Sequence, residues 1–122
     1  MSFLTYIASD NPIPASALLC PLSIGGEDVY TEKQYVAAVV PDLKEMDELW
    51  ELLKHLVGKA GEIEIWRIWQ GIEYRPVIRS KVIPRDYLTV EELRELDGKD
   101  VANETTTSYG IPVQYRIIIV AK

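Results

Sequence analysis

The chain is 122 residues long, with 48% hydrophobic residues, 26% charged residues and a formal net charge of −6. This length fits one domain that buries a core of its own, and so ordinary a composition excludes a disordered chain. The acidic balance argues against a nucleic-acid binder, because contacts to phosphate need a local excess of Lys and Arg.

The N-terminal stretch "MSFLTYIASD" has no basic residue ahead of its apolar run, which argues against an export signal. No apolar run approaches the roughly 18 residues that a membrane-spanning helix needs. The single cysteine, Cys20, has no internal partner for a disulfide, which is typical of a protein in a reducing compartment. We therefore expect a cytoplasmic protein that has no membrane partner.

Residues 1–33 are predicted to form a strand followed by a turn-rich extension. The strand covers residues 2–8, and the prolines and glycines after it indicate turns around a short apolar run, "ALLCPLSI", that suits an edge strand. The next segment, residues 34–40, is apolar at nearly every position. A run of this kind predicts a strand in the centre of a sheet or covered on both faces.

A helix from Leu43 to Val57 is the clearest predicted element. Its apolar residues recur three and four positions apart, which places them on one face of the helix. Asp42 suits the N-cap, and Gly58 suits the glycine position that ends a helix. Trp50 lies on the apolar face, so we expect it to be part of the core.

The stretch "EIEIWRIWQGIEYRP", residues 62–76, predicts a β-hairpin that turns at Gln70-Gly71. In this register Trp69 faces the core, whereas Trp66 faces outward and lies opposite Arg75. That geometry suits cation–π stacking of the guanidinium on the indole. A β-bulge in the first strand would exchange the two faces.

The second strand of the hairpin continues to Ile83, and a short helix follows, with Thr89 as its N-cap. A polar loop over residues 97–111 comes next, and then a strand over residues 113–121. From residue 34 onward the order is therefore β-α-β-β-α-β, which is that of the ferredoxin-like (split βαβ) arrangement. We predict a single α+β domain over residues 1–122 with a mainly antiparallel sheet, in which residues 34–121 form this unit.

No motif in the sequence specifies a catalytic residue, a cofactor or a metal ion. Cys20 has apolar neighbours, which indicates a buried, unreactive thiol. The one histidine, His55, suits a surface pair with Glu51, since the two are four positions apart on the predicted helix. The acidic residues of the turns lack the spacing of a calcium loop and are typical of solvated turns.

One predicted surface differs in charge from the rest of the chain. From Trp66 to Asp86, five basic residues accompany two acidic ones, although the whole chain is acidic. The candidate partner-binding residues share the outer face of the predicted sheet and are Trp66, Arg75, Arg79, Lys81 and Arg116. An aromatic residue among arginines is typical of an interface hot spot. The same composition also suits a solvated sheet face whose arginines pair with Glu62 and Glu64.

Three hypotheses about function follow from these residues. The first is a non-enzymatic binding protein, antitoxin-like or immunity-like, whose partner is another protein or a second copy of the chain. The second is a homodimer that binds a small molecule between its sheet and helices, with residues 97–111 as a lid. Its candidate pocket residues are Tyr6, Tyr35, Tyr74, Tyr109 and Tyr115. The third is an enzyme that has no recognisable motif.

Overall fold

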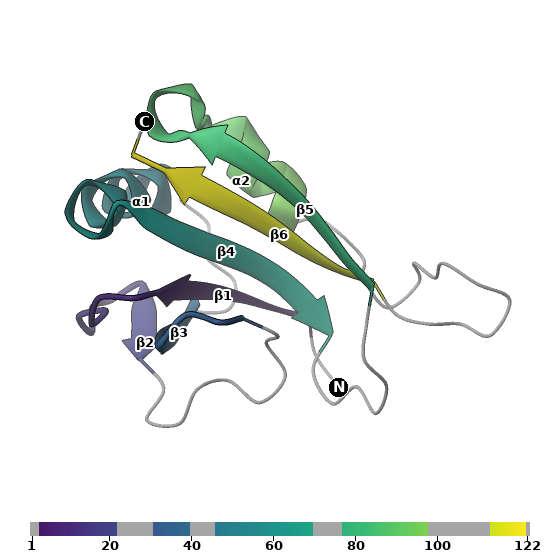
Figure 1. Ribbon diagram of the computed structural model, residues 1–122, viewed down its shortest axis with the longest axis horizontal. Helices are drawn as coiled ribbons and strands as arrows, with labels where there is room; N and C mark the ends of the chain where they lie inside the picture. The colour runs from purple at the N-terminus through teal and green to yellow at the C-terminus, as the bar shows by residue number, and fades with distance from the viewer. Residues whose placement is uncertain (1–2, 22–30, 40–45, 70–76, 98–112, 122) are drawn as a thin grey trace, which may run out of the picture.

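A computed structural model describes residues 3–21, 31–39, 46–69, 77–97 and 113–121 of the chain. Within these ranges, two α-helices lie against one six-stranded mixed sheet, so the fold is a small α+β domain, as predicted (Figure 1). The elements in chain order are β1 (Phe3–Ser9), β2 (Leu19–Pro21), β3 (Tyr35–Val39), α1 (Met46–Ala60), β4 (Glu62–Trp69), β5 (Val77–Pro84), the 3-10 turn η1 (Arg85–Tyr87), α2 (Val90–Asp97) and β6 (Val113–Val120). Neither of these helices is long and apolar enough to cross a membrane.

The strands are arranged in the order β2-β3-β1-β4-β6-β5. Neighbouring strands are antiparallel except β5 and β6, which are parallel and are joined by a crossover that contains α2. The predicted hairpin is therefore wrong, because β6 lies between β4 and β5. The ferredoxin-like order is not the one observed either, since it would pair these two consecutive strands directly.

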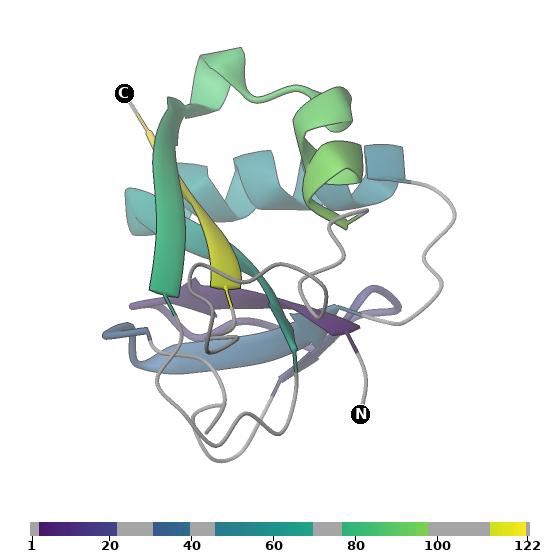
Figure 2. The same ribbon diagram turned by 90° about the vertical axis from the view of Figure 1, so that its right-hand side faces the viewer.

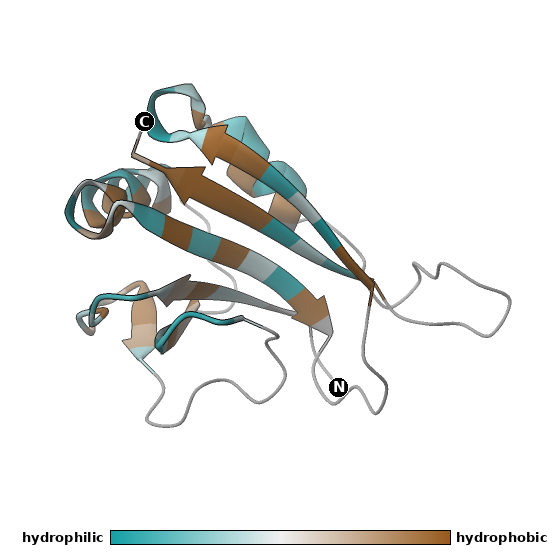
Figure 3. Cartoon of the chain, in the orientation of Figure 1, coloured by the Kyte–Doolittle hydropathy of each residue, from teal (hydrophilic) through white to brown (hydrophobic). Residues whose placement is uncertain are grey.

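The composition of β5 and β6 accounts for their positions in the sheet. β6 reads "VQYRIIIV" and keeps a long apolar run, whereas β5 reads "VIRSKVIP" and is interrupted by charged and polar residues in its middle (Figure 3). A central strand is less accessible to solvent than an edge strand, which tolerates charged side chains and proline. The inner position therefore falls to β6 and the edge to β5.

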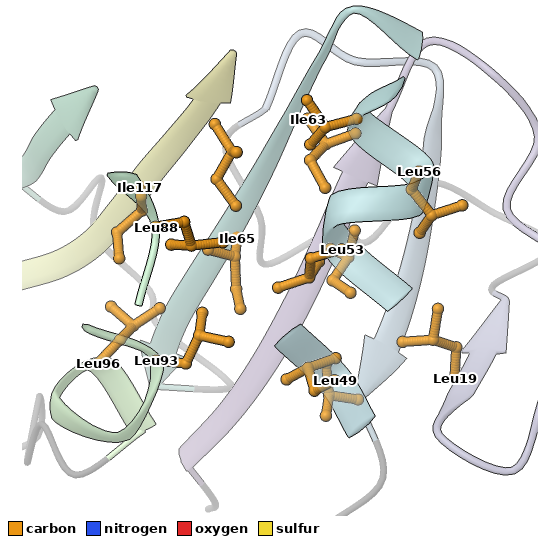
Figure 4. Close-up of a cluster of buried hydrophobic side chains, with 14 of the residues drawn as sticks. Leu19, Leu49, Leu53, Leu56, Ile63, Ile65, Leu88, Leu93, Leu96 and Ile117 are labelled. Carbon is orange, nitrogen blue, oxygen red and sulfur yellow. The ribbon is translucent and has the colours of Figure 1, made fainter. Parts of the chain in front are cut away.

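Both helices cover the same face of the sheet (Figure 2). Alternate strand residues point toward this face and pack against leucines of α1 and α2, as the period of two in a strand requires (Figure 4). The fully enclosed members of this core include Ile7, Leu49, Leu53, Ile63, Ile65, Leu93, Ile117 and Ile119.

Capping residues define where the helices begin and end. The predicted N-cap of α2 is confirmed, because Thr89 Oγ1 accepts a hydrogen bond of 3.3 Å from the Glu92 N–H. Helix α1 continues to Ala60, so Gly58 lies inside its last turns and is not the terminal glycine. Gly61 takes that place, with a φ of 82°. Its N–H donates a 2.8 Å hydrogen bond to the Val57 carbonyl.

Trp50 connects α1 to the segment that leads into α2. It is half-buried and packs against the main core, which confirms its predicted place. Its indole Nε1 donates a hydrogen bond of 2.8 Å to the Leu88 carbonyl, and the Lys54 ammonium lies 4.3 Å from the ring centroid. The indole thus packs on the core with one edge and reaches a polar partner with the other.

Lys33 connects the segment before β3 to two strands. Its Nζ lies 3.1 Å from Asp10 Oδ2, next to β1, and 2.6 Å from Glu62 Oε2 at the start of β4. Burial alone would lower the pKa of Lys33, but the hydrogen bonds to Glu62 and Asp10 and their negative charges outweigh it. The pKa of Lys33 is therefore raised above its ordinary 10.5.

The two glycines near the end of α1 provide a matched test of this geometry. Gly61→Ala should destabilise the fold by about 1 kcal/mol, because a side chain disfavours the left-handed conformation. Gly58→Ala should stabilise it by about 0.5 kcal/mol through helix propensity. The new Cβ at position 58 would meet Arg85 Nη1 at 2.9 Å, and the flexible end of that side chain can move. Urea denaturation measures both, and a neutral Gly61→Ala would contradict the assigned helix end.

The raised pKa of Lys33 predicts a pH-dependent contribution to stability. A group whose folded-state pKa is raised stabilises the fold fully below its unfolded pKa, and the effect is lost as the pH rises through the folded-state value, here above 10.5. We expect Lys33→Met to be less stable than the wild type at neutral pH. Urea denaturation at rising pH should bring the two proteins together, whereas a constant difference in unfolding free energy would contradict the ion pairs.

Candidate functional site

Of the five residues predicted to share a contact surface, the four that the structure describes lie on different faces of the sheet. Trp66 and Arg116 are cross-strand neighbours on the face away from the helices. Arg79 and Lys81 lie on the helix face, since they align with Tyr115 and Ile117 of β6. Arg75 lies outside the described residues. The predicted grouping fails because β5 takes its register from β6 and not from β4.

Trp66 is fully buried, with 0% of its surface exposed, so its predicted outward position is wrong. It belongs to a second apolar cluster, on the face away from the helices, with Tyr6, Ala8, Val36 and Ile68. The strand order explains the burial, because β1 and β6 flank β4 and place Trp66 between Tyr6 and Arg116. The side chain of Trp69, predicted to be in the core, lies outside the described part.

A polar network surrounds Trp66 and fixes its orientation. The Trp66 Nε1–H donates to Glu64 Oε1 at 2.9 Å, and the Thr31 hydroxyl donates to the same oxygen at 2.5 Å. Arg116 Nη1 lies 3.7 Å from Glu64 Oε2, and its guanidinium carbon is 5.2 Å from the Trp66 ring centroid. The predicted cation–π contact on Trp66 therefore exists, but Arg116 makes it instead of Arg75.

This network satisfies a carboxylate that is almost completely removed from water. Glu64 is 6% exposed, and a buried charge is tolerated in a protein when it is paired and hydrogen-bonded. Arg116 extends the network to the edge of the sheet, where its Nε donates a 2.9 Å hydrogen bond to Ser80 Oγ. These contacts link β4, β5 and β6, so the network stabilises the sheet.

Other residues singled out in the sequence do not converge on one site. Cys20 is exposed on the short edge strand β2, so the prediction of a buried thiol is wrong. His55 is exposed on α1, where the sequence placed it. Tyr6 lies on the opposite face from Tyr35 and Tyr115. The remaining two candidate tyrosines, and most residues of the predicted 97–111 lid, lie outside the described ranges.

A groove lies between the β5 edge of the sheet and helix α2, and we call it the β5–α2 groove. Its volume is about 210 Å³. It is lined by Arg79, Ser80, Lys81, Glu92, Glu95, Leu96, Tyr115, Arg116 and Ile117. Leu96 and Ile117 are buried and form its apolar base, while the exposed side chains of Arg79 and Glu95 stand on opposite walls. The groove thus combines an apolar base with charged walls, as ligand sites commonly do.

The charged side chains on the two walls of the groove differ in whether they form an ion pair. Lys81 Nζ lies 2.5 Å from Glu92 Oε2, so this pair connects the strand wall to the helix wall. Within the described ranges no carboxylate pairs with Arg79. Its guanidinium is therefore the cation that the groove offers to an incoming carboxylate. The same ranges hold no group of three His, Cys, Asp or Glu residues that would bind a metal ion.

The β5 edge also collects apolar side chains on the surface. Of the four large hydrophobic residues that are exposed in the described part, three lie on β5 or directly after it: Val77 at 39%, Val82 at 59% and Tyr87 at 76%. Among the described strands, β5 pairs with β6 alone, so none of them uses the hydrogen-bonding groups of its other edge. Sequence reasoning missed these residues, although the charged interruption "RSK" in an apolar strand is a signal of an edge.

Substitution of Trp66 tests its buried position. Trp66→Ala should destabilise the fold by about 3 to 5 kcal/mol, as large truncations in a core do. Trp66→Phe retains most of the apolar contact but removes the donor to Glu64, so it should cost less, about 1 to 3 kcal/mol. Chemical denaturation of the three proteins checks the order, and a Trp66→Ala variant as stable as the wild type would place the indole in solvent.

A comparison of the chain with protein-family models, curated proteins and solved structures finds no match. No activity is therefore carried over from a relative, and the function is inferred from the β5 edge and the β5–α2 groove themselves.

Proposed function

We propose that this chain is a non-enzymatic binding protein that takes up an extended segment of another protein along β5. The observation that carries this proposal is the outer edge of β5, with which no described strand pairs; β5 is an eight-residue strand with exposed Val77, Arg79 and Val82. An extended peptide that adds to such an edge gains main-chain hydrogen bonds from the strand. Its specificity comes from the side chains on either side of that edge.

The side chains around β5 are more typical of an edge that binds a partner than of an edge that is only protected from aggregation. An edge that only needs protection from aggregation is short or carries charged residues and proline, and the three-residue β2 is of this kind. β5 has protective features too, namely Lys81 and Pro84, but it also exposes Val82 and Tyr87. Arginine and tyrosine, present here as Arg79 and Tyr87, are enriched in binding hot spots.

A second copy of the chain is a poorer occupant of this edge. If two β5 strands paired about a two-fold axis, Arg79 and Lys81 of one copy would lie next to the same residues of the other. Like charges that face each other across strands are destabilising. For the same reason the edge favours a segment that carries negative charge. An antitoxin-like role with a basic partner would instead use the acidic parts of the surface, away from β5.

Binding of a small molecule in the β5–α2 groove is the second candidate. The groove lies between sheet and helix, where the pocket of a small-molecule binder was predicted. Arg79 and Glu95 on its two walls would suit a ligand that carries one negative and one positive group. Its volume of about 210 Å³ is below the roughly 300 Å³ from which ligand pockets usually start. We therefore propose that the groove receives side chains from one face of a peptide bound along β5.

A peptide library selected on the intact protein tests the proposal. Peptides of about twelve random residues that are enriched on the protein should shift the backbone amide signals of β5 and β6 in an NMR titration. Arg79→Glu should weaken their binding about tenfold, which corresponds to about 1.4 kcal/mol. Enriched peptides that shift the amides of other elements instead would contradict the proposal.

Arg94→Glu is the matched control for this experiment. Arg94 is an exposed arginine on α2, paired with Glu91 at 2.8 Å, and it does not line the groove. Its substitution changes the net charge by the same amount as Arg79→Glu does. Binding should therefore change less than twofold in Arg94→Glu, since exposed ion pairs away from an interface contribute little. An equal loss in both variants would point to overall charge rather than to the β5 edge.

A further inference from the structure

The two faces of the β5 edge differ in chemistry, and this difference specifies the bound segment. Side chains alternate along a strand, so Arg79 and Lys81 point to the helix face, whereas Ile78, Ser80 and Val82 point to the other face. In the middle of the strand the edge is thus cationic on the helix face, where exposed Val77 precedes Arg79, and mostly apolar on the other face, with Val82 59% exposed.

We infer that the segment recognised at β5 alternates apolar residues with an acidic residue at the position beside Arg79. The inference rests on the proposed function. An added strand places its side chains alternately on the same two faces of the sheet, next to those of β5. On one face they lie beside Arg79 and on the other beside Ile78 and Val82. A carboxylate suits the first position and a β-branched apolar residue suits the second.

One acidic residue should dominate the recognition rather than a run of them. Lys81 already has Glu92 as its partner at 2.5 Å, so it offers less to a further carboxylate than Arg79 does. Glu92 and Glu95 line the helix wall of the groove and would repel additional negative charge. The bound segment is therefore amphipathic, with a single well-placed carboxylate, and not a polyacidic tail.

Designed peptides test this pattern directly. The probe is the labelled peptide TVTVEVTVT, compared with TVTVKVTVT, TVTVQVTVT and the block-ordered VVVVETTTT, which has the same composition as the probe. Fluorescence polarisation with the intact protein should show the probe binding at least about tenfold more tightly than the lysine peptide. It should also bind more tightly than the glutamine and block-ordered peptides.

A charge exchange separates the pairing with Arg79 from general effects. In Arg79→Glu the preference should reverse, so that the lysine peptide binds better than the probe, and this binding also shows that the variant is folded.

N-methylation of the probe tests its pairing as a strand. Methyl groups on every second backbone nitrogen, in two alternate phases, should abolish binding in one phase and spare it in the other, since only one set of N–H groups faces β5.

The outcomes distinguish the inference from the function on which it rests. Peptides that all shift the β5 amides with equal affinity would overturn the charge and alternation pattern and leave strand addition at β5 standing. A preference that persists unchanged in Arg79→Glu would overturn the role of Arg79. If no designed peptide binds while library peptides still shift β5, the predicted pattern is wrong; if neither set shifts β5, strand addition itself is wrong.

Discussion

The parallel pairing of β5 with β6 is the constraint on which the second half of the fold depends. It places β6 between β4 and β5, so Ile117 and Ile119 complete the core under the helices while Arg116 lies on Trp66. It also leaves β5 with a single strand neighbour among the described residues. The buried tryptophan network and the exposed edge therefore have the same origin in the sheet.

The two faces of the sheet are stabilised by different kinds of contact. Under the helices the cluster consists of apolar side chains, mostly leucines and isoleucines, whose packing needs no directional contact. On the other face, Trp66 is buried next to the carboxylate of Glu64, and here each polar group must find a partner. Thr31, Trp66 and Arg116 surround that carboxylate, so this face depends on hydrogen-bond geometry as well as on apolar contact. Arg79 and Val82, the residues that the proposed function uses, belong to neither cluster.

Local signals in the sequence were sufficient to predict most helices and strands, but not to predict which strands pair with each other. The period of the α1 leucines and the Thr89 cap depend on neighbours within a turn of helix, and both were predicted correctly. Gly58 and Gly61 are three residues apart, and the helix end fell to the one that adopts a positive φ. Alternation along β6 puts Arg116 on the face opposite Ile117 and Ile119, and the register of β6 with β4 then puts it beside Trp66.

The candidate site was predicted poorly because it depends on strand order. The turn predicted at Gln70-Gly71, which lies outside the described residues, made a hairpin the simplest pairing, but a distant strand with a longer apolar run took the place of the sequence neighbour of β4. Every inference about the outward faces of β5 used the hairpin register, so Arg79 and Lys81 were assigned to the wrong face. Trp66 was expected to be exposed for the same reason, and Cys20 was judged by its neighbours in sequence rather than by the exposure of strand β2.

The position of β6 also has a consequence for how the chain reaches this fold. β4 obtains both of its strand neighbours from distant parts of the sequence, since residues 62–67 pair with 115–120 and residues 63–69 pair with 3–9. Contacts between such distant segments close large loops and slow the folding reaction. Until β6 docks, the apolar edge of β4 and both edges of β5 are open to other chains. We therefore expect self-association to compete with refolding at high protein concentration, and this hazard falls once β6 pairs with β4 and with one edge of β5.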